Sequence, residues 1–83
     1  MQDFELKTAL HVEKVKRLDI LEENKIRAKV QIEDYQKLLE YTKDWINPGK
    51  LVYKLDLLIL NQEAYLVSIN SEMNKLKQEI ANA

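Results

Sequence analysis

Residues 45–50 of the chain, Trp45-Ile46-Asn47-Pro48-Gly49-Lys50, contain its only proline and its only glycine. These two residue types interrupt regular structure more strongly than any others, and here they stand together near the middle of the sequence. The Asn47 side chain can cap a helix, and Pro48 suits the first helical position because an N–H there would have no partner within the helix. The segment therefore predicts a turn at about residues 46–49 between two helices.

The sequence on either side of this turn is rich in Leu, Lys, Glu, Ile, Gln and Ala, which are mostly good helix formers. We predict a first helix over about residues 3–46, with Asp3 as its N-cap, and a second over about residues 48–81. No stretch has the pattern of a strand or a β-hairpin. The predicted fold is all-α: residues 1–83 form one domain, an antiparallel two-helix hairpin with long, coiled-coil-like helices.

Each predicted helix carries a seam of residues at heptad spacing. In the first helix this seam is apolar from Leu18 onward, apart from Lys25 and Thr42, and it includes Leu21, Ala28, Ile32, Tyr35 and Leu39. In the second helix we assign the seam to Leu51, Leu55, Leu58, Gln62, Tyr65, Ile69, Glu72 and Leu76. The Gln62 amide either fixes register and oligomeric state or marks the edge of the buried zone. On the solvated side of the first helix, i,i+4 spacing predicts the ion pairs Glu13–Arg17, Glu23–Arg27 and Glu33–Lys37.

The second helix is apolar on more than one side. Between Leu57 and Ser71 its only charged residue is Glu63. Apolar residues also lie off the assigned seam, at Val52, Leu57, Ile59, Leu60, Ala64, Leu66 and Val67. A helix of this kind is normally buried nearly all round, whereas a single antiparallel neighbour covers one stripe. We therefore expect self-association or a partner to complete the hairpin, most simply as a two-fold dimer that forms a four-helix bundle.

Length and composition point the same way. Eighty-three residues make one small domain at most, and the absence of cysteine removes disulfides and thiolate metal sites as stabilisers.

The net charge of −1 and the low arginine content argue against nucleic-acid binding, and the basic clusters around Lys16 and Arg27 alternate with acidic residues. The N-terminus lacks the apolar region of a signal peptide, and polar residues interrupt the apolar stretch Leu51–Ile69. We expect a cytoplasmic protein without a membrane span.

The sequence offers no catalytic constellation. The single histidine, His11, has no carboxylate three or four residues away, because those neighbours are Lys7, Thr8, Lys14 and Val15. Ser68 and Ser71 should lie roughly 20 Å from His11 along the hairpin. No Glu-x-x-His motif is present to build a di-metal site, and one glycine cannot form a phosphate-binding loop. We expect no enzyme activity, no cofactor, no metal and no small-molecule substrate.

Four of the five tyrosine and tryptophan residues stand near the predicted turn: Tyr35, Tyr41, Trp45 and Tyr53. They either close that end of a helical bundle or contact a partner, since tyrosine and tryptophan are enriched in interface hot spots.

The Asn47-Pro48 turn, Leu51 and the run Tyr65-Leu66-Val67-Ser68-Ile69-Asn70-Ser71 resemble small subunits of bacterial type III secretion systems. That resemblance covers some 25 residues and implies a helical hairpin. The long, highly charged first helix is unlike a needle subunit and is closer to the co-chaperones that hold needle subunits in the cytoplasm. No functional residue is carried over from it.

We therefore expect a protein–protein interaction module whose second helix is the principal interface, in a homo-oligomer or on a partner. The alternative is a small co-chaperone or adaptor of a secretion-type assembly; a nucleic-acid-associated helical protein is the weakest option. The predicted interface residues are Ile32, Tyr35, Leu39, Leu55, Leu58, Ile59, Gln62, Tyr65, Leu66 and Ile69.

Overall fold

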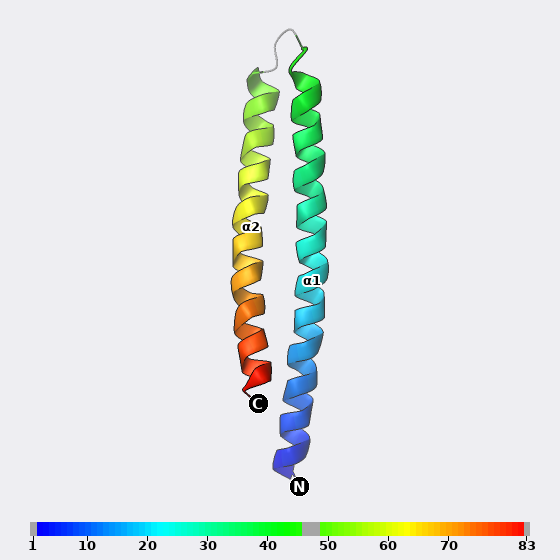
Figure 1. Cartoon of the computed structure of the whole chain (residues 1–83), viewed down its shortest axis with the longest axis vertical. Helices are drawn as coiled ribbons and strands as arrows, with labels where there is room; N and C mark the ends of the chain where they lie inside the picture. The colour runs from blue at the N-terminus through cyan, green and yellow to red at the C-terminus, as the bar shows by residue number, and fades with distance from the viewer. Residues whose placement is uncertain (1, 46–48, 83) are drawn as a thin grey trace.

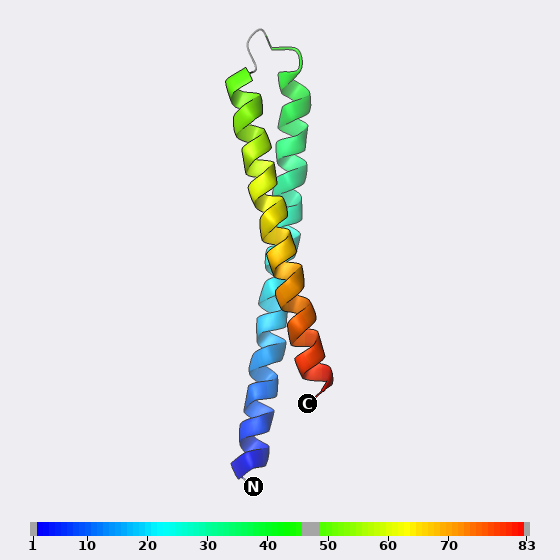
Figure 2. The same ribbon diagram turned by 90° about the vertical axis from the view of Figure 1, so that its left-hand side faces the viewer.

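The structure is a computed structural model that describes residues 2–45 and 49–82, with side chains described from residue 6 onward. It consists of two antiparallel helices, α1 (Gln2–Thr42) and α2 (Gly49–Ala81), which lie side by side along their length (Figures 1 and 2). The molecule measures 70 × 15 × 15 Å, and the N-terminal end of α1 extends past the end of α2. The predicted all-α hairpin is confirmed, with no strand in the described residues.

Helix α1 ends at Thr42, four residues before the predicted boundary. The Thr42 hydroxyl donates a hydrogen bond to the Leu39 carbonyl oxygen at 2.8 Å, and the backbone N–H of Trp45 donates to the Thr42 carbonyl oxygen at 3.1 Å. The backbone bond from Trp45, together with the one that the Lys43 N–H donates to the Glu40 carbonyl oxygen at 3.4 Å, is of the i to i−3 type that tightens the last turn of a helix. At the other end Asp3 lies inside α1, which begins at Gln2, rather than at the N-cap. The predicted roles of Asn47 and Pro48 fall outside the described residues.

Gly49 begins α2 as an ordinary helical residue. None of the described residues has a positive φ angle, and a Cβ atom added at Gly49 would have no neighbour within 4 Å. Neither backbone conformation nor crowding therefore requires glycine at this position.

The seam predicted for α1 is the one that faces α2. Leu21, Ala28 and Thr42 are buried, and the residues between them at heptad spacing are half-buried: Leu18, Lys25, Ile32, Tyr35 and Leu39. Of the polar side chains on this seam, Lys25 is half-buried, and the buried Thr42 hydroxyl donates to the backbone. The burial pattern confirms the heptad frame from Leu18 to Thr42.

The seam of α2 differs from the predicted one at alternate positions. Its buried residues are Leu55, Ile69 and Met73, and its half-buried ones include Val52, Ile59, Gln62, Leu66, Leu76 and Ile80. The predicted frame shares residues 55, 62, 69 and 76 with this seam but adds 58, 65 and 72, whereas the structure adds 59, 66 and 73. Apart from the shared Gln62, both frames are apolar up to Ile69, after which one continues with Glu72 and the other with Met73. Burying Met73 avoids burying a carboxylate.

The most buried cluster lies in the half of the hairpin away from the turn. Leu21, Ile69 and Met73 form it, each no more than 3% exposed, and Leu18 and Leu76 pack against it. The core of the hairpin is thus a single layer of side chains between two helices.

Candidate interaction surface

The hairpin leaves a second apolar stripe of α2 uncovered. We call it the outer stripe and define it by the exposed residues Tyr53, Leu57, Leu60, Ala64 and Val67. Their spacing of four, three, four and three residues is the heptad spacing of a helix-packing seam. At about 100° per residue, this stripe lies on the side of α2 that faces away from α1. Tyr53, Leu60 and Val67 are 67%, 60% and 70% exposed.

A second uncovered surface combines both helices near the turn. We call it the turn-end face and define it by Leu38 of α1 with Leu51, Leu58 and Tyr65 of α2. Leu51 is half-buried and the other three are exposed.

An ion pair further along the hairpin shows that the α1 and α2 residues of this face lie on the same side of the molecule. Leu38 shares its heptad position with Arg17, and Leu58 and Tyr65 share theirs with Glu72. The Arg17 Nε atom lies 3.1 Å from Glu72 Oε1, and Nη2 lies 3.5 Å from Oε2. The two heptad positions therefore lie on the same side of the hairpin, which becomes apolar toward the turn.

Charged side chains bridge the two helices only away from the turn, within the described residues. There, Arg17 pairs with Glu72, and Lys14 Nζ lies 3.8 Å from Glu79 Oε2. The ion pair predicted between Glu13 and Arg17 is replaced, because Arg17 reaches across to α2 and Glu13 pairs with Lys16 at 3.9 Å. The pairs expected at Glu23–Arg27 and Glu33–Lys37 are not formed in the described structure.

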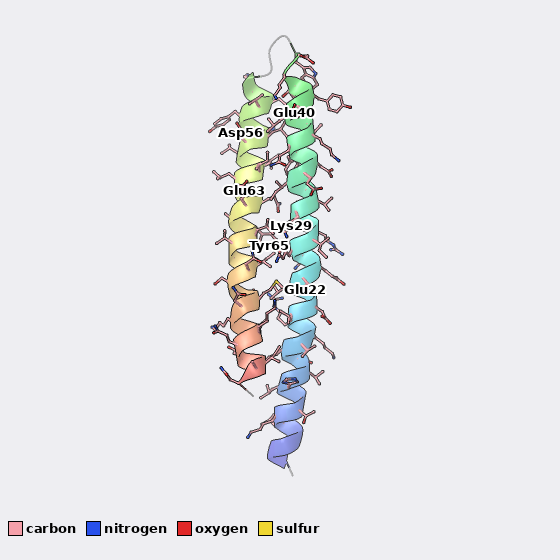
Figure 3. The ribbon with its side chains drawn as sticks, in the orientation of Figure 1. Glu22, Lys29, Glu40, Asp56, Glu63 and Tyr65 are labelled. Atoms are coloured by element: carbon pink, nitrogen blue, oxygen red, sulfur yellow. The ribbon has the colours of Figure 1, made fainter. Side chains whose placement is uncertain are left out.

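The acidic residues Asp56 and Glu63 of α2 border the outer stripe on one edge. Figure 3 shows both of them on α2, with Glu22, Lys29 and Glu40 on α1. Asp56 and Glu63 stand one heptad apart, so they lie on the same edge of the helix. Neither forms an ion pair in the part of the chain that the structure describes.

Most of the predicted interface residues face the other helix of the same chain. Leu55 and Ile69 are buried between α1 and α2, and six more are half-buried: Ile32, Tyr35, Leu39, Ile59, Gln62 and Leu66. Leu58 and Tyr65 remain exposed, at 39% and 44%. Contact of any of these residues with a partner stays a prediction, as does the role of Gln62 in fixing register.

The predicted interface residues do not include the outer stripe. The seam assigned from the sequence leaves out Leu57, Leu60, Ala64 and Val67, and Tyr53 is placed with the aromatic residues near the turn. The signal that identifies it is its own heptad spacing, which runs from Tyr53 to Val67 and ends at Ser71 and Asn74.

The aromatic residues near the turn do not form a closed end within one chain. Tyr35 is half-buried in the seam, but Tyr41, Trp45 and Tyr53 are 73%, 55% and 67% exposed. The expectation that all of them close the end of the bundle is therefore not met by the hairpin alone. A partner contact remains the alternative for the three exposed rings.

The described residues bring together no chemical site. His11, Ser68 and Ser71 are exposed, and no three potential metal ligands among His, Cys, Asp and Glu cluster in the described ranges. A shallow depression is lined by α1 alone, by Glu33, Gln36, Lys37, Leu39 and Glu40. Over the residues described, neither helix has a stretch long and apolar enough to cross a membrane.

The fold and these surfaces define the chain as a helical hairpin with two uncovered apolar surfaces. Comparison of the sequence and the structure with protein-family models, curated proteins and solved structures gives no match.

Proposed function

We propose that this protein is a non-enzymatic protein–protein interaction module. It buries the apolar surfaces of α2 near the turn, in a homo-oligomer or on a partner protein. The observation that carries the proposal is the outer stripe, a second helix-packing seam on a helix that already packs against α1 through its first.

The energetics favour covering these surfaces. Fully burying a large aliphatic side chain gains roughly 1.5–3 kcal/mol relative to leaving it exposed. Leu57, Leu60 and Val67 of the outer stripe and Leu58 of the turn-end face are exposed together on three turns of one helix. Soluble proteins rarely expose such contiguous apolar surface unless it binds something.

The geometry also specifies the kind of partner element. Heptad spacing places knobs where a facing helix offers holes, so the outer stripe suits a helix better than a loop or a sheet edge. The stripe spans fifteen residues from Tyr53 to Val67, which is about four helical turns. A partner helix of about that length would cover it.

Single aspartate substitutions test the proposal. Leu60→Asp places a charge in the outer stripe, and Leu58→Asp places one in the turn-end face. Asn61→Asp is the matched control, because it adds the same charge to the polar side of the same helical turn. We expect at least one of the two leucine variants to lose self-association in sedimentation velocity, or to lose a stoichiometric partner retained by the purified wild-type chain.

Circular dichroism should show that the affected variant is still helical. The proposal is wrong if the wild-type chain stays monomeric and partner-free, or if Asn61→Asp has the same effect as the leucine variants.

A co-chaperone or adaptor of a secretion-type assembly is the second candidate. The resemblance of residues 65–71 to small type III secretion subunits supports it, as does the presence of two separate apolar surfaces, which lets one chain hold two partners. Binding of the purified chain to a helical subunit, blocked by Leu60→Asp but not by Asn61→Asp, is the expected result. Salt-dependent retention on DNA or RNA would instead favour the weaker nucleic-acid alternative.

A further inference from the structure

We propose that the turn-end face is covered by a second copy of this chain, in a four-helix bundle whose two turns lie at the same end. This inference rests on the proposed function and adds the identity and orientation of one partner.

The intrachain register sets which residues lie at the same height. The two ion pairs between the helices join residues whose numbers add to 89, for Arg17–Glu72, and to 93, for Lys14–Glu79. Leu38 therefore lies within about one helical turn of the height of Leu51, and Gln31 within about one turn of the height of Leu58. A two-fold axis parallel to the helices keeps these heights, so α1 of one copy lies antiparallel to α2 of the other in the same register.

The charges at the outer edge of the turn-end face match in this arrangement. Asp34 follows the seam residue Ile32 by two positions, and Lys54 follows Val52 by two, so they occupy equivalent edge positions on α1 and α2. Both are exposed, and neither forms an ion pair among the described residues. In the bundle, Asp34 of each copy lies within about one helical turn of Lys54 of the other, which gives two interchain ion pairs.

The charged residues on this side of the hairpin, further from the turn, are also compatible with the proposed bundle. Arg17 and Glu72 are 51% and 44% exposed at their side chains although they contact each other. Two copies related by the same axis bring a second such pair to the same height. The four charges then alternate in sign around the bundle, so no like charges face each other directly.

The opposite orientation of the two copies excludes the Asp34–Lys54 contacts. If the turns lay at opposite ends with the turn-end faces overlapping, α1 of one copy would lie against α1 of the other, and α2 against α2. Asp34 and Lys54 of different copies would then lie on different helix pairs and could not form these two ion pairs.

The outer stripe is a poorer site for the second copy. An antiparallel pairing of two outer stripes about Leu60 sets Asp56 against Glu63 twice, and like charges directly opposite are destabilising. The second copy therefore covers the turn-end face and leaves the outer stripe for a different helix.

A charge-exchange experiment tests the arrangement on the full chain. Lys54→Glu sets two carboxylates against each other at both interchain contacts, and Asp34→Lys sets two ammonium groups against each other. Each variant alone should weaken the dimer on the order of twenty-fold, if each exposed contact changes by a factor of about five. An equimolar mixture of the two variants should recover dimers, because both contacts in the mixed dimer are then attractive.

Sedimentation equilibrium at low and high salt measures these affinities, and circular dichroism checks helix content. Lys50→Glu is the matched control, because it reverses a neighbouring exposed charge of α2 that lies outside these contacts. Recovery of dimers in the mixture, but by neither variant alone, supports the same-end bundle.

Three results would overturn the inference: a wild-type chain that is monomeric at tens of micromolar, single variants that dimerise like the wild type, or a mixture without recovery. Leu58→Asp should dissociate this dimer and Leu60→Asp should not. If instead only Leu60→Asp dissociates the chain, the proposed interaction function stands and this assignment of the second copy is wrong.

Discussion

The two halves of α2 differ in how many apolar stripes they carry. From residue 68 to residue 81 the large apolar side chains lie only on the seam, at Ile69, Met73, Leu76 and Ile80. From Gly49 to Val67 the seam continues, but the outer stripe and the turn-end face are added to it. All of the large hydrophobic residues of α2 that are exposed in the described structure lie between Tyr53 and Val67.

The half with fewer apolar residues nevertheless contains the best-buried cluster. Leu21, Ile69 and Met73 pack there, and the Arg17–Glu72 and Lys14–Glu79 ion pairs flank them. A single apolar stripe bordered by charge leaves one way to pack, whereas three stripes exceed what one neighbouring helix can cover. We infer that the far half specifies the hairpin and the turn half specifies what the hairpin binds.

The largest expected effect is a loss of stability when a core residue in the far half of the hairpin is truncated. Ile69→Ala removes a side chain that is 2% exposed and should lower the free energy of unfolding by about 2–5 kcal/mol. Val67→Ala, two residues away and 70% exposed, is the matched control and should change stability by less than about 0.5 kcal/mol. Urea denaturation followed by circular dichroism measures both. Equal losses of stability in the two variants would contradict the distinction between the buried core and the uncovered outer stripe.

The seam register of α2 provides the next test. Leu66→Ala should destabilise the hairpin by about 1–2 kcal/mol, which is less than the roughly 2–5 kcal/mol typical of fully buried aliphatic truncations, because Leu66 is half-buried. Tyr65→Ala should cost less at concentrations low enough to keep the chain from self-associating, because Tyr65 lies outside the seam. Thermal denaturation of the two variants at equal concentration decides between the frames. A larger loss for Tyr65→Ala would favour the frame through residues 58, 65 and 72.

These comparisons show which parts of the structure local sequence patterns can specify. The division into two helices and the α1 seam were predictable because proline and glycine are unfavourable in helix interiors and because Leu18, Leu21 and Ala28 repeat at heptad spacing. The α2 frame was not, because apolar residues occupy both candidate frames up to residue 71, apart from the shared Gln62. The two frames differ in hydrophobicity only beyond residue 71. There one frame continues with the apolar residues Met73 and Ile80, whereas the other continues with the charged residues Glu72 and Glu79.

Two further differences arise from interactions that a periodic pattern does not contain. The early end of α1 coincides with i to i−3 backbone hydrogen bonds that Lys43 and Trp45 donate. The loss of the expected Glu13–Arg17 pair depends on Glu72 lying across from Arg17, which follows from the hairpin register. For the candidate surfaces, the sequence indicated excess apolar area on α2 but not how α1 would divide it into covered and uncovered stripes.

A smaller effect is expected at the start of the turn half. Gly49→Ala should raise the free energy of unfolding by about 0.4–1 kcal/mol, because alanine restricts the unfolded chain and Gly49 needs no positive φ angle. The thermal midpoint should rise by a few degrees. Ser68→Ala, an exposed substitution in the middle of α2, serves as a comparison for helix propensity alone. A drop in the midpoint for Gly49→Ala would show that the turn needs glycine for a reason other than the space around it.

The smallest expected effect belongs to the ion pair that flanks the core. A double-mutant cycle with Arg17→Ala and Glu72→Ala should give a coupling of about 0.2–1 kcal/mol, because both side chains are about half exposed. The coupling should shrink as salt rises, since exposed charges are screened. Lys16 and Glu13, an i,i+3 pair within α1, form the control cycle and should couple more weakly. A coupling near zero for Arg17 and Glu72 would mean that the buried cluster around Ile69 and Met73 sets the register of the far half without help from this ion pair.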